Sequence, residues 1–197
     1  HSEYLYYNLG NAYYRNGMVG QSIWAYNKAI SLSPRLESVK YNLEIVSSKI
    51  KDRVILPPEL FIVHIYINLK SVISYYELLV LGSILLLLTV CCFVALKFFI
   101  FNNHIIKKIN YMFIFITFIV HLIIIDVFLE KNEKQFGIIV FDNVSAYSGP
   151  FYGDNTILFT VNEGTKAQLS QEQGEWFEIV ILNGGKAWIP KEKIRIL

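Results

Sequence analysis

The chain has 197 residues, of which 54% are hydrophobic, and its formal net charge is +2 at pH 7. This composition favours a membrane protein with soluble parts over one water-soluble globule. The nearly balanced charge excludes the basic surface by which proteins usually bind nucleic acid.

Residues 3–34 have the spacing of two amphipathic helices. Gly17 separates the two helices and Pro34 ends the second. A third amphipathic helix is predicted to follow, to about Lys51. The apolar side chains recur every three or four residues, as is typical of a buried helix face: Tyr6, Leu9, Tyr13, Ile23, Tyr26, Ala29, Ile30, Leu36, Val39, Leu43, Val46 and Ile50.

Residues 6–34 resemble a tetratricopeptide repeat, a helix pair that recurs every 34 residues. In such repeats small residues let the helix backbones approach, as Gly10 and Ala29 would here. One repeat with a capping helix in residues 1–52 makes a small core. We therefore expect that the chain is truncated before His1, or that a partner covers the open face. Eight positions carry the resemblance: Tyr6, Leu9, Gly10, Tyr13, Ser22, Tyr26, Ala29 and Pro34.

The concave groove of this repeat family binds an extended peptide or a partner helix. Asn11 and Asn42 match the two asparagines of the repeats that clamp a C-terminal carboxylate. Tyr7 stands where those repeats have lysine, which argues against such a clamp. The alternative is that the asparagines satisfy backbone groups where helices meet. The resemblance implies these groove residues: Tyr4, Tyr7, Asn11, Tyr14, Arg15 and Asn42.

Residues 53–77 are predicted to be a linker and a helix that lies along the membrane surface. Pro57 and Pro58 end the helical region. The stretch from Glu59 to Glu77 is apolar and aromatic, but polar residues such as His64 and Lys70 interrupt it, so it is a poor third span.

Residues 78–129 are predicted to be a hairpin of two membrane spans. Leu78–Leu96 carries no charge, and Ile109–Leu129 carries only Asp126, near its end. The 12-residue connection Lys97–Lys108 is too short for a domain, so both soluble parts lie on one side of the membrane. The connection and the outer flanks carry three lysines each, and the denser loop favours a cytoplasmic loop.

Residues 130–197 have the pattern of a small all-β barrel. Asn183-Gly184-Gly185 predicts a tight hairpin turn, because such turns need positive φ. Five short strands are expected, separated by turn residues: Gly137–Phe141, Ile157–Val161, Lys166–Leu169, Trp176–Leu182 and Lys186–Ile189.

This segment resembles a bacterial SH3-like domain, a barrel that binds peptides or cell-wall peptide stems. The matching residues are Val144-Ser145, Ser148-Gly149-Pro150, Glu163-Gly164, Trp176 and Trp188-Ile189. Ala187 stands where the family usually has glycine. We expect Trp188 in the core, and for Trp176 a core position is the alternative to a ligand contact. The resemblance implies this ligand surface: Tyr147, Phe151, Tyr152 and Trp176.

No pattern in the chain predicts catalysis. The four histidines have no metal-ligand spacing, and no nucleophile motif or phosphate-binding loop is present. His121 and Asp126 are five residues apart, so they do not share a helix face as a proton relay would need. We therefore expect a binding protein without a metal or cofactor.

The order of these segments resembles BatE-type proteins of the Bacteroides aerotolerance operon. Residues 7–15 (YNLGNAYYR) and 40–44 (KYNLE) are similar to that family's signature. The resemblance implies a bacterial inner-membrane protein with periplasmic soluble parts and a role in stress tolerance. Its implied partners are von Willebrand A-domain membrane proteins and a MoxR-type ATPase.

Two functions are expected from these features. The first is a non-enzymatic adaptor that binds its partners through the repeat and the SH3-like part. The alternative is an envelope sensor or peptidoglycan-anchoring protein that acts through the SH3-like part.

Overall fold

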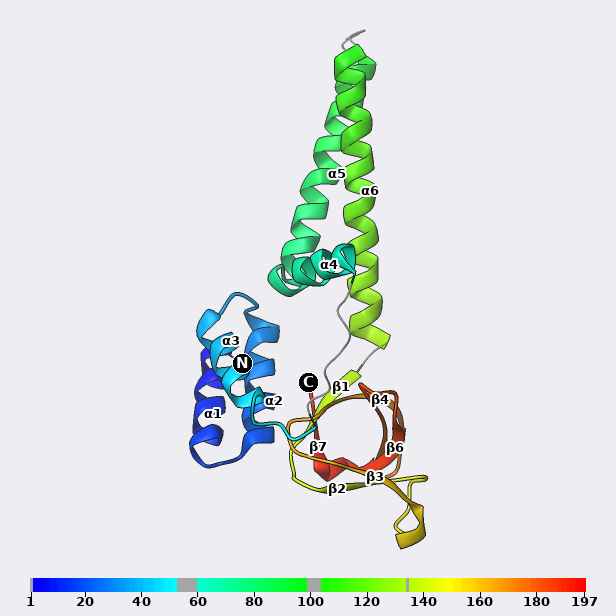
Figure 1. Cartoon of the computed structure of the whole chain (residues 1–197). Coiled ribbons are helices and arrows are strands. Elements are labelled where there is room, and N and C mark those ends of the chain that lie inside the picture. The colour runs from blue at the N-terminus through cyan, green and yellow to red at the C-terminus, as the bar shows by residue number, and fades with distance from the viewer. Residues whose placement is uncertain (1, 53–59, 99–103, 134) are drawn as a thin grey trace. The chain divides into compact units, whose positions relative to one another are not determined.

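The computed structural model describes residues 2–52, 60–98, 104–133 and 135–197. These residues form six α-helices and a seven-stranded antiparallel sheet (Figure 1). The chain divides into two compact units, residues 1–64 with 134–197, and residues 65–133. The helices are α1 (Glu3–Arg15), α2 (Val19–Leu32), α3 (Glu37–Ser47), α4 (Phe61–Val72), α5 (Tyr75–Phe98) and α6 (His104–Glu133).

The first three helices pack as the apolar spacing predicts. Gly17 adopts a φ of 74° between α1 and α2, which is the left-handed region that glycine enters without strain. A Cβ atom added to Gly10 would lie 2.5 Å from Cε1 of Tyr26, so the predicted close approach of α1 and α2 is confirmed. The buried Ser22 donates its hydroxyl to the carbonyl of Gly10, at 2.9 Å, and Ala29 is fully buried.

The antiparallel sheet has the strand order β3-β2-β6-β5-β4-β1-β7, and its strands curve around a common core (Figure 1). Ile139, Ile179 and Ile189 lie at its centre with no exposed surface. The strands are β1 (Gln135–Ile139), β2 (Val144–Tyr147), β3 (Ile157–Val161), β4 (Lys166–Gln173), β5 (Trp176–Ile181), β6 (Lys186–Pro190) and β7 (Ile194–Ile196), with 3-10 turns at Asp154–Thr156 and Lys191–Lys193.

Five of these strands overlap the predicted ones, although β1 begins and ends two residues earlier and β4 runs four residues further. β5 and β6 form the predicted hairpin, with Gly184 at a φ of 86°. The sequence does not predict β2 and β7 as strands. They have four and three residues, and runs this short show too little alternation to be recognised.

The helices and the sheet of the first unit share an interface, although they come from opposite ends of the chain. Ile138 of β1 is buried in the apolar cluster of the three helices. The backbone N–H of Gly20 donates to the Glu163 carboxylate at 2.8 Å, and the Trp24 indole N–H donates to the carbonyl of Ile196 at 2.9 Å. Glycine is required in α2, because a Cβ at Gly20 would lie 2.5 Å from the carbonyl oxygen of Ile139.

Asp52 ties the end of the helical region to the sheet. Its carboxylate accepts hydrogen bonds from the backbone N–H of Asn162 at 2.6 Å, from the Asn162 amide at 2.8 Å and from the Thr165 hydroxyl at 3.2 Å. Three donors on one carboxylate fix the chain direction after α3, because charge-assisted hydrogen bonds are the stronger ones. The predicted soluble segments 1–52 and 130–197 therefore meet in one unit, apart from residues 130–133, which belong to α6 of the second unit.

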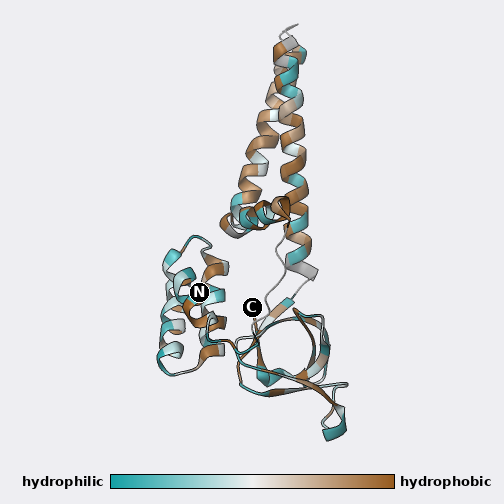
Figure 2. Ribbon diagram, viewed as in Figure 1, coloured by the Kyte–Doolittle hydropathy of each residue, from teal (hydrophilic) through white to brown (hydrophobic). Residues whose placement is uncertain are grey.

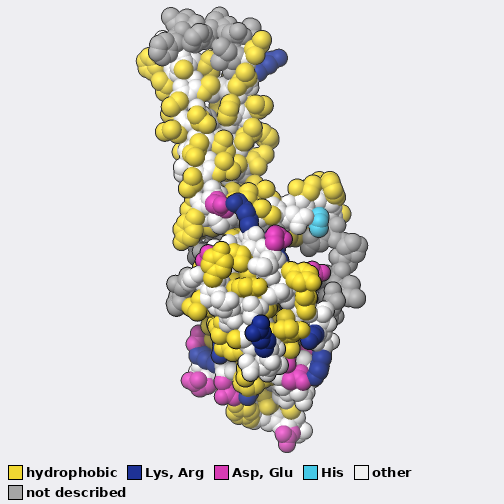
Figure 3. Space-filling model, turned by 90° about the vertical axis from the view of Figure 1, so that its left-hand side faces the viewer, with side chains coloured by type: hydrophobic (Ala, Val, Ile, Leu, Met, Phe, Trp, Pro, Cys, Tyr) yellow, Lys and Arg dark blue, Asp and Glu magenta, His cyan; other side chains and the backbone are white. Residues whose placement is uncertain are grey.

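The second unit contains two helices long and apolar enough to cross a membrane, Tyr75–Phe98 and Lys107–Glu130. Both are hydrophobic over most of their length (Figure 2), and charged side chains gather near their ends (Figure 3). Thr89 and Thr117 join them by a hydroxyl–hydroxyl hydrogen bond of 2.8 Å. A Cβ at Gly82 would lie 2.6 Å from Cδ1 of Ile124, so this glycine permits the close approach of α5 and α6.

Helix α4 is apolar but has only 12 residues. At about 1.5 Å per residue it is too short to cross a hydrocarbon core of about 30 Å. Its Lys70 pairs with Glu130 and with Asp126, the latter at 2.9 Å, and its Tyr66 hydroxyl also bonds Asp126. Burial lowers the pKa of the Lys70 ammonium, but its bonds to Glu130 and Asp126 raise that pKa above its ordinary value.

Candidate functional site

Three of the six predicted groove residues form a stripe on one face of α1. Tyr7, Asn11 and Tyr14 follow one another at spacings of three and four, so they share a side of the helix. Tyr7 and Tyr14 are half-buried against the apolar cluster of the three helices. The Lys49 ammonium lies 4.6 Å from the centre of the Tyr14 ring, a cation–π distance. The stripe is therefore partly occupied by contacts within the helical region.

A polar network links this stripe to the neighbouring helices. The Asn11 side-chain oxygen accepts hydrogen bonds from the Tyr26 hydroxyl at 2.7 Å and from the Asn42 amide at 2.9 Å. Burial raises the pKa of Tyr26, which keeps its hydroxyl a neutral donor. Asn11 and Asn42, predicted together, are brought together by the structure, but through side chains that bond each other. They hold α1 against α3, and a contact with a bound peptide stays a prediction.

The two remaining groove residues are open to solvent. Tyr4, one turn before Tyr7, is 60% exposed, and Arg15 is exposed at the last turn of α1. Exposed aromatic and arginine side chains are the types that contribute most to protein interfaces. Tyr4 and Arg15 are therefore the residues of this set best placed to touch a partner.

The second predicted surface is a cluster of three aromatic rings on the outer face of the sheet. The ring centres of Tyr147 and Trp176 are 5.5 Å apart, those of Tyr147 and Tyr152 are 5.6 Å apart, and those of Tyr152 and Trp176 are 4.7 Å apart. Tyr152 is 71% exposed, whereas Trp176 is buried beneath it. Phe151, the fourth predicted residue, is exposed and lies against Gly149.

The expected core position of Trp188 is wrong. Side chains alternate between the faces of a strand, and Ala187 and Ile189 point into the core. Trp188 therefore faces outward and is only half-buried. It pairs across the sheet with Tyr147 and with Glu178, so it lies beside the aromatic cluster. The position of Trp188 in the sequence motif does not indicate on which face of the sheet its side chain lies.

Glu178 is a buried acidic side chain on this outer face. Its carboxylate accepts a hydrogen bond from the Ser170 hydroxyl at 2.5 Å and pairs with Lys186 at 3.0 Å. Burial alone would raise the pKa of the Glu178 carboxyl, but the bonds from Ser170 and Lys186 lower it below its ordinary value. The group therefore remains ionised and supports the sheet beneath the aromatic cluster.

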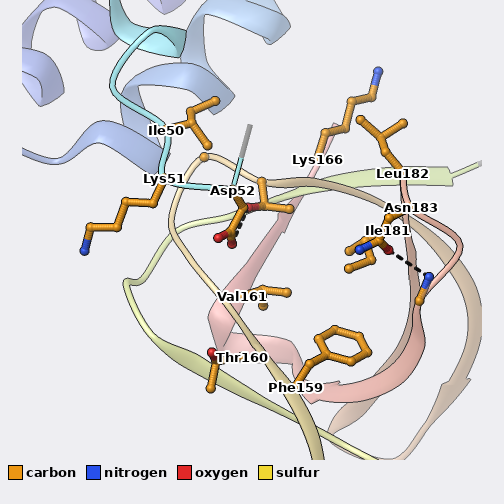
Figure 4. A pocket seen from close by; sticks show the side chains of 13 residues that line it. Ile50, Lys51, Asp52, Phe159, Thr160, Val161, Lys166, Ile181, Leu182 and Asn183 are labelled. Atoms are coloured by element: carbon orange, nitrogen blue, oxygen red, sulfur yellow. Dashed lines mark hydrogen bonds between the residues drawn. The ribbon is translucent and has the colours of Figure 1, made fainter. Parts of the chain in front are cut away.

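Two cavities flank the sheet. One, of about 400 Å³, lies beside the aromatic cluster and is lined by Tyr147, Tyr152, Asn143 and Lys193 among others. The other, of about 550 Å³, opens between β3 and the β5–β6 hairpin. Figure 4 shows Phe159 and Val161 of β3 beside Ile181 in this cavity, while Lys51 and Lys166 extend away from it. Neither cavity is evident from the sequence, because each combines residues from separate strands.

The residues that join helices to sheet are also missed by the sequence patterns. Trp24 and Arg195 are the clearest examples, since the guanidinium lies 4.9 Å from the centre of the indole ring. Trp24 lies outside the predicted apolar face of its helix. A large aromatic residue on the opposite side of an amphipathic helix indicates that this side also packs against another part of the protein.

The described residues contain few of the side-chain groupings that metal binding or redox chemistry requires. Among them, no three His, Cys, Asp or Glu side chains gather closely enough to hold a metal ion. Cys91 and Cys92 of α5 are free thiols. His121 bonds the carbonyl of Thr117 at 2.8 Å, whereas Asp126 bonds side chains of α4.

No protein-family model matches the chain, and no curated protein matches it. Its function is therefore inferred from the contacts, exposure and charge of its own residues.

Proposed function

We propose that the chain is a non-enzymatic membrane adaptor. In this proposal the three N-terminal helices act as a tetratricopeptide-type repeat with its cap, and the sheet acts as an SH3-like barrel. The two long apolar helices anchor both parts in a bacterial inner membrane, with the soluble unit on the periplasmic side.

The observation that carries the proposal is the interface between helices and sheet. Asp52 bonds Asn162 and Thr165, and Gly20 bonds Glu163, so segments from both ends of the chain form one unit. That unit bears two separate exposed surfaces, one around Tyr4 and the other around Tyr152. Two binding surfaces on one membrane-anchored unit suit a protein that holds two partners close to each other.

The proposed partners are membrane proteins with von Willebrand A domains, and through them a MoxR-type ATPase. The resemblance to BatE-type proteins suggests these partners, and the exposed Tyr4 and Arg15 give them a surface of suitable chemistry. The same resemblance suggests a role in aerotolerance and stress response.

Purification of the full chain from its native membrane in mild detergent tests the proposal. Wild type should retain proteins with von Willebrand A domains, and the Tyr4→Ala/Arg15→Ala variant should lose them. Arg35→Ala is the matched control, because Arg35 is also exposed but lies after α2. Retention of the same proteins by the double variant would show that this surface is not the docking site.

The aromatic cluster favours a second candidate, an envelope sensor or peptidoglycan anchor. Stacked tyrosine and tryptophan rings beside a cavity of about 400 Å³ suit a peptide or a cell-wall stem. Binding of the full chain to purified peptidoglycan should then fall with Tyr152→Ala and persist with Leu158→Ala, which removes another exposed apolar side chain. Equal binding by both variants would count against this candidate.

A further inference from the structure

Strand β3 lies at one edge of the sheet. It pairs with β2, and no second strand among the described residues pairs with its other side. An open strand edge presents backbone N–H and C=O groups that can pair with another chain. Phe159, Thr160 and Val161 of this strand line the cavity of about 550 Å³ that opens toward the β5–β6 hairpin.

The hydrogen bonds of Asn162, the residue after β3, show which backbone groups face the open side. Its N–H donates to the Asp52 carboxylate at 2.6 Å, and its C=O accepts from the Thr165 N–H at 3.3 Å. On the β2 side, the Asn143 N–H donates to the Asn162 side chain instead of its backbone. Backbone groups alternate in direction along an antiparallel strand, so Thr160 also directs its N–H and C=O away from β2.

Asp52 also shows that this edge can bind an acceptor from a distant part of the chain. Its carboxylate takes the place that the carbonyl of a neighbouring strand would have at Asn162. Thr160, two residues before Asn162, is exposed and offers the next donor and acceptor of the same edge.

The cavity beside Thr160 is apolar on its inner side. Phe159, Val161 and Ile181 lie there together (Figure 4), and Leu182 at the hairpin is 58% exposed. Its volume falls within the range of about 300–1,000 Å³ that is typical of ligand pockets. Successive side chains of a strand point to opposite faces. In a chain paired with Thr160, the residues before and after the paired one would therefore point into this cavity.

The open edge and the cavity together fit an extended peptide better than a second copy of this chain. The inward side chains of a second β3 are already used, because Phe159 and Val161 pack in the core of their own sheet. We propose that β3 binds an extended segment of a partner protein as an additional strand. One residue of the segment pairs with Thr160, and an adjacent large apolar side chain enters the cavity. This site is separate from the surfaces around Tyr4 and Tyr152, so its test does not depend on whether those surfaces bind.

The backbone pairing is tested with the acetylated peptide Gln-Leu-Thr-Leu-Gln, which carries a fluorescent dye at its C-terminus. Fluorescence polarisation measures its Kd for the full chain in detergent. N-methylation of the central threonine removes the N–H that faces β3 and should weaken binding about tenfold. N-methylation of the leucine that follows is the matched control, because that N–H faces away from β3. Equal effects of the two methyl groups, or no binding at millimolar peptide, would overturn the proposal.

The same bond is tested from the protein side with Thr160→Pro, which removes the backbone N–H. Proline is tolerated on an edge strand where its nitrogen faces solvent, so the β2–β3 bonds should remain. Peptide binding should fall about tenfold. Thr160→Val is the matched control, since it keeps the N–H and should bind as wild type does. Circular dichroism checks that both variants fold, and equal binding by the two folded variants would refute the pairing.

The cavity is tested by removing apolar groups from either side. Alanine in place of both peptide leucines should weaken binding about 30-fold. Leu182→Ala should weaken it about threefold, whereas Leu158→Ala, which removes an equally exposed leucine outside the cavity, should not.

Two results would show that something else covers the edge. Protection of the Thr160 amide from hydrogen exchange in the peptide-free chain would mean that the edge is already paired. A dimer that Thr160→Pro dissociates would mean that a second copy is the occupant. Either result would overturn the proposal.

Discussion

Replacing Gly20 by alanine should separate the helices from the sheet. The new Cβ would lie 2.5 Å from the carbonyl oxygen of Ile139 and 2.9 Å from the Cα of Val140. Both atoms belong to the backbone, so they cannot rotate away as a side chain would. The 2.8 Å hydrogen bond from the Gly20 N–H to Glu163 would lengthen with the same movement.

The size of the effect follows from three contributions. Overpacking costs typically about 1–3 kcal/mol, and a hydrogen bond to a charged group contributes about 1.5–3 kcal/mol. Alanine in a helix recovers up to about 1 kcal/mol relative to glycine. We therefore expect a loss of about 2–4 kcal/mol in the free energy of unfolding of the soluble unit.

Urea unfolding of the full chain in detergent, followed by hydrogen exchange, measures this loss. Exchange should rise in α2 and in β1 together, because these elements face each other across the interface, while α5 and α6 stay unchanged. Gly153→Ala is the control, since the three heavy atoms nearest to its new Cβ would all belong to the Thr156 side chain. If Gly20→Ala leaves the stability within about 0.5 kcal/mol of wild type, the interface described above does not hold the two parts together.

Three further changes test separate contacts. Gly10→Ala places a Cβ 2.5 Å from the Tyr26 ring, so thermal unfolding should show a loss of about 1–3 kcal/mol. The lowered pKa of Glu178 means that its contribution to stability is present above its ordinary pKa and is lost as pH falls through the folded value. Glu178→Gln removes that contribution, so its free energy of unfolding by urea should fall less than that of wild type as the pH is lowered below the ordinary glutamate pKa of 4.5. An equal fall in both proteins would refute that role. Lys70→Gln removes both ion pairs to α6, so amide exchange in α4 should accelerate, and unchanged exchange would mean that these pairs do not hold it.

Local features of the fold were predictable because they depend on residues near each other in the sequence. Gly17 and Pro34 mark the ends of helices, and the spacing of apolar residues identifies their buried faces. The two long apolar helices are equally evident, since a run of about 20 apolar, uncharged residues has the length of a helix that crosses a membrane. The turn at Gly184 is recognised by the φ value that it requires.

Contacts between distant residues were not predictable. Asp52 has an ordinary position in a polar linker, and its three hydrogen bonds appear only when β3 and β4 are placed beside it. The face of Trp188 depended on strand register, and a shift of one residue reverses it. The candidate site was predictable in part. The sequence pattern assigned Asn11 and Asn42 to the same groove, but it did not show that their side chains bond each other.

The most direct test of the adaptor function is site-specific photo-crosslinking from the exposed end of α1. A photoreactive phenylalanine at position 4, introduced in the full chain and irradiated in the native membrane, samples whatever contacts this surface. We predict cross-links to a membrane protein with a von Willebrand A domain, and none to it from the same amino acid at exposed position 158 of β3. If position 4 yields no protein cross-link while position 152 captures cell-wall fragments, the adaptor account is contradicted and the peptidoglycan anchor takes its place.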